Sequence, residues 1–254
     1  MHHVRFRDHD GNVRTGGYAP DAEQITSHPS DRPISLAPET FDPEEVRFLP
    51  PCEPSKVVCV GRNYADHADE MGSDIPDRPL LFLKPPNTLA AHGERVTVLA
   101  DKERIDYEAE LAVVVGERAK GLSEDNAMDA VAGFTCVNDL SNRDDQMQEQ
   151  NWVRGKAFDD SCPVGPVVAT PDEVPDDAAV RCRLNGETVQ DASRSQFIFD
   201  IPELLAEITT YLTLEPGDVV STGTPAGVGP VADGDTVEVE VEGVGTLRNE
   251  IHVP

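Results

Sequence analysis

The chain has 254 residues, enough to bury a large core, and we expect one domain or one domain with a small appendage. Its 48 Asp and Glu against 21 Lys and Arg give a formal net charge of −27, which disfavours nucleic acid and anionic membranes as partners. No apolar run reaches the length of about 18 residues that a membrane span needs, and the N-terminus lacks an apolar signal core. We therefore expect a cytoplasmic protein.

The acidic excess is spread along the chain, and lysines are few. The five lysines are Lys56, Lys84, Lys102, Lys120 and Lys156. Such a composition suits a very salty cytoplasm, where a Debye length of about 3 Å at 1 M salt screens self-repulsion. We therefore predict a salt-adapted host. The five cysteines are scattered without a Cys-x-x-Cys pair, so neither a disulfide scaffold nor a zinc site is expected.

Residues 1–52 are predicted to form a small N-terminal β-rich domain or linker, and residues 53–254 the main domain. The N-terminal stretch begins with a hairpin that turns at Asp10-Gly11. Proline punctuation follows, at Pro29, Pro33, Pro38, Pro43, Pro50 and Pro51. This region carries no chemistry that the sequence identifies.

The main domain is predicted to be mainly β with flanking helices (α+β). Apolar runs predict strands at 56–61, 80–85, 95–99, 105–115 and 130–139, and a strand that ends in a Gly-rich turn at 217–229. Hairpins are expected at 180–190, around Asn185-Gly186, and at 235–251. Helical segments are expected at 62–72, after an N-cap at Ser123, and at 200–214 behind Asp200.

Two of the predicted buried strands bring three carboxylates into the same region of the chain. Glu108 and Glu110 are two apart on one strand and so share a face, and Asp139 ends the next strand. The Glu-x-Glu spacing alone carries little weight, because it recurs on a solvent-facing strand at Glu238, Glu240 and Glu242. The apolar run after Glu110 predicts that its strand is buried, and buried acids need partners.

Carboxylates about 4 Å apart repel by roughly 4 kcal/mol at an effective dielectric near 20. Protons or a divalent cation must therefore neutralise the group of three, and we interpret it as a metal site. An all-oxygen site without His or Cys suits hard cations.

Two further motifs admit a functional and a structural interpretation. His67 and Glu70 form a His-x-x-Glu pair, and on a helical turn the two side chains lie on the same face. The glutamate then either orients the histidine as a general base, or both side chains simply lie in solvent. Asp139, Arg143 and Gln146 have helical spacing. They either form one polar face that holds a metal and a substrate, or belong to a capped helix on the surface.

Lys156 and the Gly-rich turn at 223–229 are equally open to two readings. Lys156 lies between a glycine and a proline that both indicate turns. Its ammonium either stabilises a bound anion or is exposed to solvent. The Gly-rich turn lacks the Lys-Ser/Thr of a P-loop, so we do not expect it to bind a nucleotide. Its backbone N–H groups either bind a carboxylate, or the turn only connects two strands.

Six stretches in order, spanning about residues 55–254, resemble the fumarylacetoacetate hydrolase superfamily. They are GRNYADHADEMG, PLLFLKPPNTL, DYEAEL, GFTCVNDLSNRDDQ, GKAFDDSCPVGP and STGTPAGVGP. The resemblance implies a mixed β-sandwich roll with a small N-terminal domain, and usually a homodimer. It also implies Mg²⁺ or Mn²⁺ on Glu108, Glu110 and Asp139.

The resemblance assigns roles to six further residues. His67 and Glu70 would form a water-activating dyad on a lid, and Lys156 would stabilise developing negative charge. The substrate would be held by Arg143, Gln146 and Thr224.

The reaction expected from this resemblance begins with a small 2-oxo acid that chelates the ion and passes through an enolate. We expect hydrolysis of a C–C bond in a 2,4-dioxo acid of the acylpyruvate or fumarylpyruvate kind. The alternatives are an isomerase or decarboxylase of 2-hydroxy-2,4-diene-dioate or oxaloacetate substrates, and a 2-keto-3-deoxy sugar-acid dehydratase. An inactive metal-binding or interaction protein is disfavoured by the intact His67–Glu70 pair.

Overall fold

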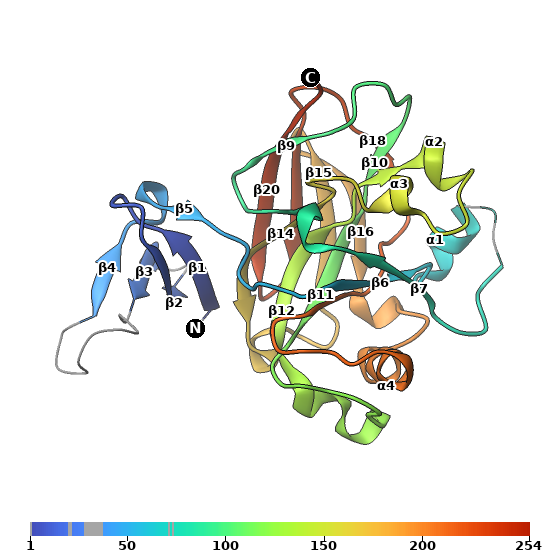
Figure 1. Ribbon diagram of the computed structural model, residues 1–254, viewed down its shortest axis with the longest axis horizontal. Helices are drawn as coiled ribbons and strands as arrows, with labels where there is room; N and C mark the ends of the chain where they lie inside the picture. The colour runs from blue at the N-terminus through green and yellow to red at the C-terminus, as the bar shows by residue number, and fades with distance from the viewer. Residues whose placement is uncertain (1, 20–21, 28–37, 71, 73) are drawn as a thin grey trace.

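The computed structural model describes residues 2–19, 22–27, 38–70, 72 and 74–254 (Figure 1). Pro29, Pro33 and Met71, which belong to predicted segments, lie outside the described residues. The architecture is mainly β with few helices, as the sequence predicts. Among the described residues, no helix combines the length and the apolar character that crossing a membrane requires.

The N-terminal region forms a small antiparallel sheet in the order β4-β3-β2-β1, with β5 also paired to β1. Its strands are β1 His2–Arg7, β2 Val13–Ala19, β3 Gln24–Ser27, β4 Glu39–Phe41 and β5 Arg47–Phe48, with a short 3₁₀ helix at Pro43–Glu45. The predicted hairpin at Asp10-Gly11 is confirmed by the β1–β2 register.

The N-terminal sheet is continuous with the large sheet through the pairing of β1 with β14, where His3 lies opposite Val168. In Figure 1 it projects to one side of the body. The division of the chain at residue 52 stays a prediction.

The main body contains a large sheet in the order β14-β12-β11-β17-β6-β7. These strands are β6 Val57–Gly61, β7 Leu80–Lys84, β11 Ala109–Val115, β12 Val131–Asn138, β14 Cys162–Ala169 and β17 Val219–Ser221, and β8 Leu89–Ala90 pairs with β14. Every residue of β11 and β14 is buried, as expected for strands covered on both faces.

A second sheet runs in the order β16-β15-β19-β20-β9 and shares one hydrophobic core with the first. Its strands are β9 Arg95–Thr97, β15 Ala179–Leu184, β16 Glu187–Ser193, β19 Thr236–Val241 and β20 Gly245–His252. The predicted hairpin at Asn185-Gly186 is confirmed, and both residues have positive φ, 53° and 84°. In β19 the valines are buried while Glu238 and Glu240 are half-buried, so those acids face solvent as predicted.

The strand predicted over Ile105–Val115 is broken, which corrects the sequence interpretation. β10 Ile105–Tyr107 pairs with β13 Ser141–Asn142 and β18 Gly229–Pro230, whereas β11 begins at Ala109 in the large sheet. Glu108 lies at the break because its N–H donates to the Asn138 side chain, 3.0 Å away, instead of to a strand neighbour.

Four α-helices and four further 3₁₀ helices lie outside the sheets within the described residues, one of the latter being Glu124–Ala130. They are α1 Ala65–Glu70, α2 Arg143–Gln146, α3 Val153–Lys156 and α4 Ile201–Tyr211, with the other 3₁₀ helices at Pro86–Thr88, Pro171–Glu173 and Arg194–Gln196. Asp200 caps α4 as predicted, because its side chain accepts from Glu203 N at 2.9 Å.

The helix predicted after Ser123 is present as a 3₁₀ helix, Glu124–Ala130, with Ser123 at its N-cap. Another helix prediction needs correction. The helix expected to carry Asp139 begins only at Arg143, where the Asn142 side chain caps it. In Figure 1, α1, α2 and α3 gather on the side of the body away from the N-terminal sheet.

Candidate active site

The structure brings Glu108, Glu110 and Asp139 together. One carboxylate oxygen from each lies within 4.8 Å of the others, and all three residues are buried. The pairing of β11 with β12 sets Ala109 opposite Asn138, and the N–H of Asp139 donates to Glu108 O at 2.9 Å. The convergence expected from sequence spacing is therefore present, although Glu108 reaches it from a strand break.

Three buried cations surround two of these carboxylates. Lys156 Nζ lies 2.7 Å from both Glu108 Oε2 and Asp139 Oδ2. Arg143 lies 2.6 Å from Glu108 Oε1, and Lys84 Nζ lies 2.7 Å from Asp139 Oδ1. Although burial alone would raise the pKa of Glu108, Lys156 and Arg143 outweigh it and hold that pKa below its usual range.

Glu110 differs because its partners are neutral. Its Oε2 accepts from the Ser221 hydroxyl and from Gly223 N at 2.8 Å, and among the described residues no ammonium or guanidinium forms an ion pair with it. Burial, followed by the charges of Asp139 and Glu108, raises the pKa of Glu110 to about 8. A buried carboxylate in this environment is short of positive charge.

The three carboxylates fit a divalent cation on two observations. Glu110 is not neutralised by a described cation, and Asp139 Oδ1 makes no well-aligned hydrogen bond with a described residue despite the nearby Lys84. Hard oxygen donors of this kind suit Mg²⁺ or Mn²⁺. The identity of the ion stays a prediction.

His67 and Glu70 lie on α1 with their side chains in contact. His67 Nδ1 is 3.1 Å from Glu70 Oε2, and the imidazole is buried at the cavity wall. Glu70 in turn accepts from Gly227 N, at 3.1 and 3.2 Å to its two oxygens. The pair is thus held by the Gly-rich turn and is not a freely solvated turn.

The Gly-rich turn does cradle carboxylates, and both belong to this chain: Gly223 N–H binds Glu110 and Gly227 N–H binds Glu70. Both glycines have φ of +98°, and a Cβ at Gly227 would meet Val189 O at 2.2 Å. Only glycine fits such positions.

Thr224, in the same turn, is fixed from two sides. Its hydroxyl donates to Ala109 O at 2.9 Å and accepts from Gln190 Nε2 at 2.9 Å. Gln190 is buried and also binds Ala109 N and Pro225 O. Thr224 is therefore tied to the backbone between Glu108 and Glu110.

A cavity of about 440 Å³ unites the predicted residues. It is lined by Glu108, Glu110, Asp139, His67, Arg143, Gln146, Lys156 and Thr224, and also by Val60, Gly61, Arg62, Phe82, Met147, Glu149 and Trp152. Of the nine residues assigned to the site from sequence, Glu70 does not line the cavity but contacts His67, which does. Arg143 also donates to Gln146 Oε1 at 2.7 Å, so these two share one face of α2 as predicted.

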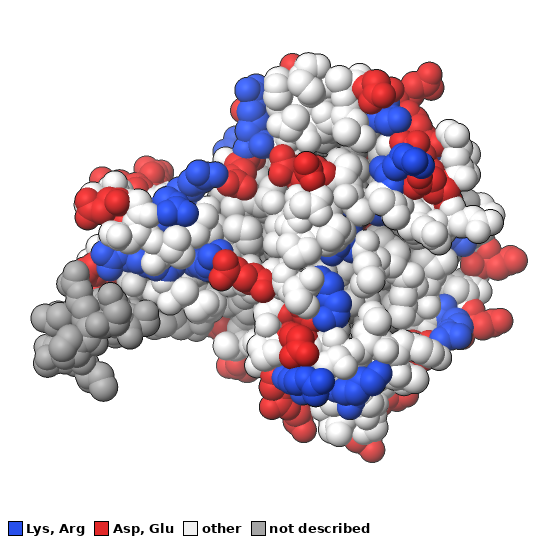
Figure 2. All heavy atoms as spheres, viewed as in Figure 1, with Lys and Arg blue, Asp and Glu red and all other residues white. Residues whose placement is uncertain are grey.

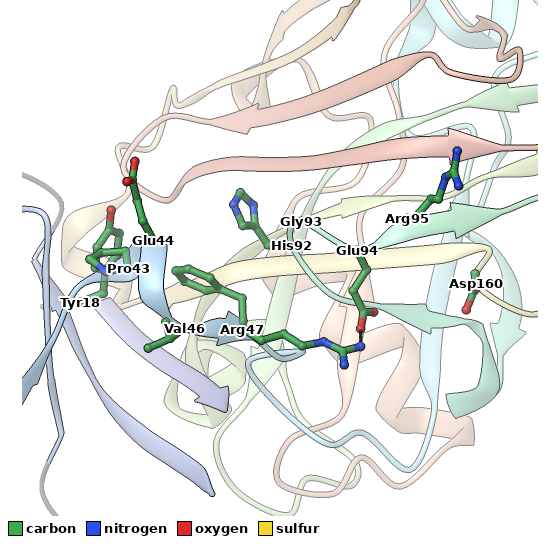
Figure 3. Close-up of a pocket in the computed structure, with 11 residues that line it drawn as sticks. Tyr18, Pro43, Glu44, Val46, Arg47, His92, Gly93, Glu94, Arg95 and Asp160 are labelled. Carbon is green, nitrogen blue, oxygen red and sulfur yellow. Dashed lines mark hydrogen bonds and ion pairs between the residues drawn. The ribbon is translucent and has the colours of Figure 1, made fainter. Parts of the chain in front are cut away.

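A larger hollow of about 830 Å³ lies elsewhere, between the N-terminal sheet and the loop before β9 (Figure 3). Arg47 from the N-terminal region pairs there with Glu94 of the main body. None of the predicted site residues lines this hollow. We place the chemistry in the smaller cavity because buried, converging charges are found there.

Sequence reasoning missed several residues that build the site. Lys84, Asp106, Gln190 and Ser221 bind the predicted residues directly. A signal existed for Lys84, a lysine at the end of the apolar run LLFLK. The partner of Gln190 could not be read from sequence, because Thr224 lies in a distant segment.

Comparisons with known proteins agree with the fold. The family model for fumarylacetoacetate (FAA) hydrolase C-terminal matches residues 56–252. Oxaloacetate tautomerase YisK of Bacillus subtilis is 41% identical over 221 residues, which cover 82% of this chain and 75% of that protein.

Two solved structures match the whole chain at 36% identity. 5-Carboxymethyl-2-hydroxymuconate delta-isomerase from Mycobacterium smegmatis has a TM-score of 0.89 with 99% of that chain covered. 2-Hydroxyhepta-2,4-diene-1,7-dioate isomerase from Mycobacterium marinum has a TM-score of 0.87 with 98% covered.

The fold and these similarities place the chain in a class of β-rich enzymes that includes hydrolases, isomerases and tautomerases. The chain belongs to the fumarylacetoacetate hydrolase family. Enzymes of this family typically use a divalent metal, and Glu108, Glu110 and Asp139 could bind one here.

Proposed function

We propose that this protein catalyses enol-forming chemistry on a small 2-oxo acid, with Mg²⁺ or Mn²⁺ held by Glu108, Glu110 and Asp139. The observation that carries the proposal is the convergence of these buried carboxylates beside Lys156 in one cavity. A divalent cation at this position would supply a Lewis acid that polarises the 2-oxo group and lowers the energy of the enolate.

The residues of the chain divide the remaining work. Glu70 orients His67 through Nδ1, which directs the other ring nitrogen to act as a proton acceptor or donor. Although burial opposes the charge of Lys156, Asp139 and Glu108 raise its pKa above the usual range, so it stays an ammonium that favours a developing anion. Arg143, Gln146 and Thr224 would hold the substrate.

Isomerisation or tautomerisation is the first reaction we propose, because a tautomerase and two isomerases are among the similar proteins. It requires one group to move a proton between carbon and oxygen, and His67 would serve as that group. This order differs from the expectation based on sequence alone, which placed hydrolysis first.

Hydrolysis of a 2,4-dioxo acid is the second candidate. It is favoured by the His67–Glu70 pair, because a dyad separate from Lys156 gives the cavity a base able to activate water. The same residues would then add that water to the second carbonyl. The C–C bond would break, its electron pair would pass to the 2-oxo acid as an enolate, and the proton taken from water would return to that carbon.

The test compares two substrates with and without Mn²⁺: the keto–enol equilibration of oxaloacetate and the cleavage of acetylpyruvate, each followed by absorbance. Glu108→Gln should weaken Mn²⁺ binding and abolish both activities. His67→Ala should retain Mn²⁺ but slow the reaction by about 10²- to 10⁴-fold. Unchanged Mn²⁺ affinity in Glu108→Gln would remove that residue from the ligand set, and full activity in His67→Ala would remove the dyad.

The protein is also proposed to be a homodimer with a 2-oxo acid as its small-molecule partner. Light scattering coupled to size-exclusion chromatography at high salt measures the oligomeric state, and a monomer at all concentrations would contradict the first of these statements.

A further inference from the structure

Two arginines line the cavity of about 440 Å³, and they differ in what they bind. Arg143 already forms ion pairs with two carboxylates of the protein, since its Nε lies 2.8 Å from Asp106 Oδ2 and its NH2 lies 2.6 Å from Glu108 Oε1. Arg62 forms no hydrogen bond or ion pair with any residue that the structure describes. The chain has a net charge of −27 and many carboxylates, so an arginine without an ion-pair partner is unexpected and suggests that its guanidinium binds a ligand.

The backbone that carries Arg62 is held in an unusual conformation. Arg62 follows β6 with φ of +60°, a region that residues with a Cβ rarely adopt. The next residue, Asn63, is fully buried and fixes the turn: its Nδ2 donates to Thr222 O at 2.8 Å and its Oδ1 accepts from Phe199 N at 2.8 Å. Such conformations persist where the surrounding structure enforces them, and they cluster at ligand sites.

The same cavity has a carboxylate-rich end and an apolar wall. The wall is formed by Phe82 and Trp152, whose ring centroids are 5.4 Å apart at 72°. Lys156 Nζ lies 5.1 Å from the Phe82 ring, so this wall begins beside the carboxylates. The cavity therefore combines an end for a 2-oxo acid, an apolar surface and a guanidinium without a partner.

Glu149 also lines the cavity, but it does not neutralise Arg62. Its carboxylate binds the guanidinium and the N–H of Arg154. The charge of Arg62 is thus available to a ligand.

The names of similar proteins already include diacids, oxaloacetate and a 1,7-dioate. We propose that in this chain Arg62 binds the second carboxylate, and so sets the preference for a 2-oxo acid with another carboxylate at its far end. This rests on the proposed function, which assigns the 2-oxo end to the three carboxylates and their cation. Guanidinium and carboxylate match in a planar, two-bond geometry. The apolar wall would contact the carbon chain between the two ends of the substrate.

The experiment measures calorimetric binding of matched acids in the presence of Mn²⁺. One pair is 2-oxoglutarate and 2-oxopentanoate, and a longer pair is 2-oxoadipate and 2-oxohexanoate. Within each pair the carbon number is the same and only the terminal carboxylate differs. At one length or both, the dicarboxylate should bind about 10- to 100-fold more tightly, the range of a charge-assisted hydrogen-bonded pair.

Arg62→Met should abolish that preference by weakening the dicarboxylate while leaving the monocarboxylate unchanged, and Arg62→Lys should retain part of it. Arg118→Met is the matched control, because Arg118 is exposed, pairs with Glu215 and carries the same charge. Equal binding within both pairs, or equal weakening of both members in Arg62→Met, would overturn this inference alone. Absence of binding of all four acids to the unaltered protein would overturn the proposed function together with it.

Discussion

Lys84 offers the sharpest test of how the buried site is held together. Its side chain is fully buried, and its ammonium donates to Ser161 O at 2.7 Å, Ser161 Oγ at 3.1 Å and Leu140 O at 3.3 Å. It also lies 2.7 Å from Asp139 Oδ1. Lys84→Met keeps a similar length and volume but removes the charge and all three donors.

The expected cost follows from these contacts. Removing one member of a buried ion pair typically costs about 3–5 kcal/mol. Asp139 keeps Lys156 at Oδ2, but its Oδ1 loses the ammonium of Lys84. The acceptors on Ser161 and Leu140 lose their donor in the same change. We therefore expect the free energy of unfolding of Lys84→Met to fall by about 3–5 kcal/mol, a large share of the 5–15 kcal/mol of an ordinary domain.

Urea unfolding at fixed KCl, without divalent cations and followed by circular dichroism, measures this loss. Lys56→Met is the matched control: Lys56 pairs with Asp218 but keeps 22% of its side chain exposed, and Asp218 also accepts from Ser55 N and Glu215 N. Asp218 is itself buried, but it keeps the N–H donors of Ser55 and Glu215, so the control should lose less than Lys84→Met. Equal losses in the two variants would refute the reasoning that burial makes the Lys84–Asp139 pair costly to break.

Three further outcomes are expected. Burial would raise the pKa of Asp8, but hydrogen bonds from Arg14 and Asn12 lower it from 3.8 to about 2. This stabilisation is complete above about pH 4 and is lost as pH falls toward 2, so the stability difference between the protein and Asp8→Asn should shrink over that range in urea titrations; a constant difference would contradict it. Gln190→Leu leaves Ala109 N and Pro225 O without their partner and should lower the free energy of unfolding by about 2–4 kcal/mol, since each buried unpaired group costs about 1–3 kcal/mol; a loss below about 1 kcal/mol in urea unfolding would argue against this role. Acidic side chains are spread over the visible face and not gathered in one patch (Figure 2), so raising KCl to about 1 M, where the Debye length is about 3 Å, should raise the midpoint of thermal unfolding; a protein most stable in dilute buffer would exclude salt adaptation.

Local signals predicted the elements that local interactions determine. The turn at Asn185-Gly186 requires positive φ at both residues, and Asn-Gly is the dipeptide that adopts it at least cost. The cap of α4 is similarly local, because Asp200 binds a backbone N–H only three residues away. Such features depend on few neighbours, so the sequence alone was sufficient.

Features decided by distant partners were not predictable in this way. The break at Glu108 follows from a bond to Asn138, which is 30 residues away, and a continuous apolar pattern conceals it. The burial of Lys84 against Asp139 and the clamp of Gln190 on Thr224 likewise join segments that only the folded chain brings together. The carboxylate cluster was predictable because its members lie on or directly beside two consecutive strands, β11 and β12, with strong apolar patterns.

The Gly-rich turn at 223–229 explains how the two halves of the proposed chemistry are kept in register. Gly223 N–H binds Glu110 of the proposed metal site, and Gly227 N–H binds Glu70 of the proposed base. Thr224, between them, is fixed to Ala109 O, in the backbone between Glu108 and Glu110. Because one short turn contacts both carboxylates, a shift of the turn would displace the base and the cation site together. The positive φ of both glycines is therefore needed by the site itself, in addition to the connection between strands.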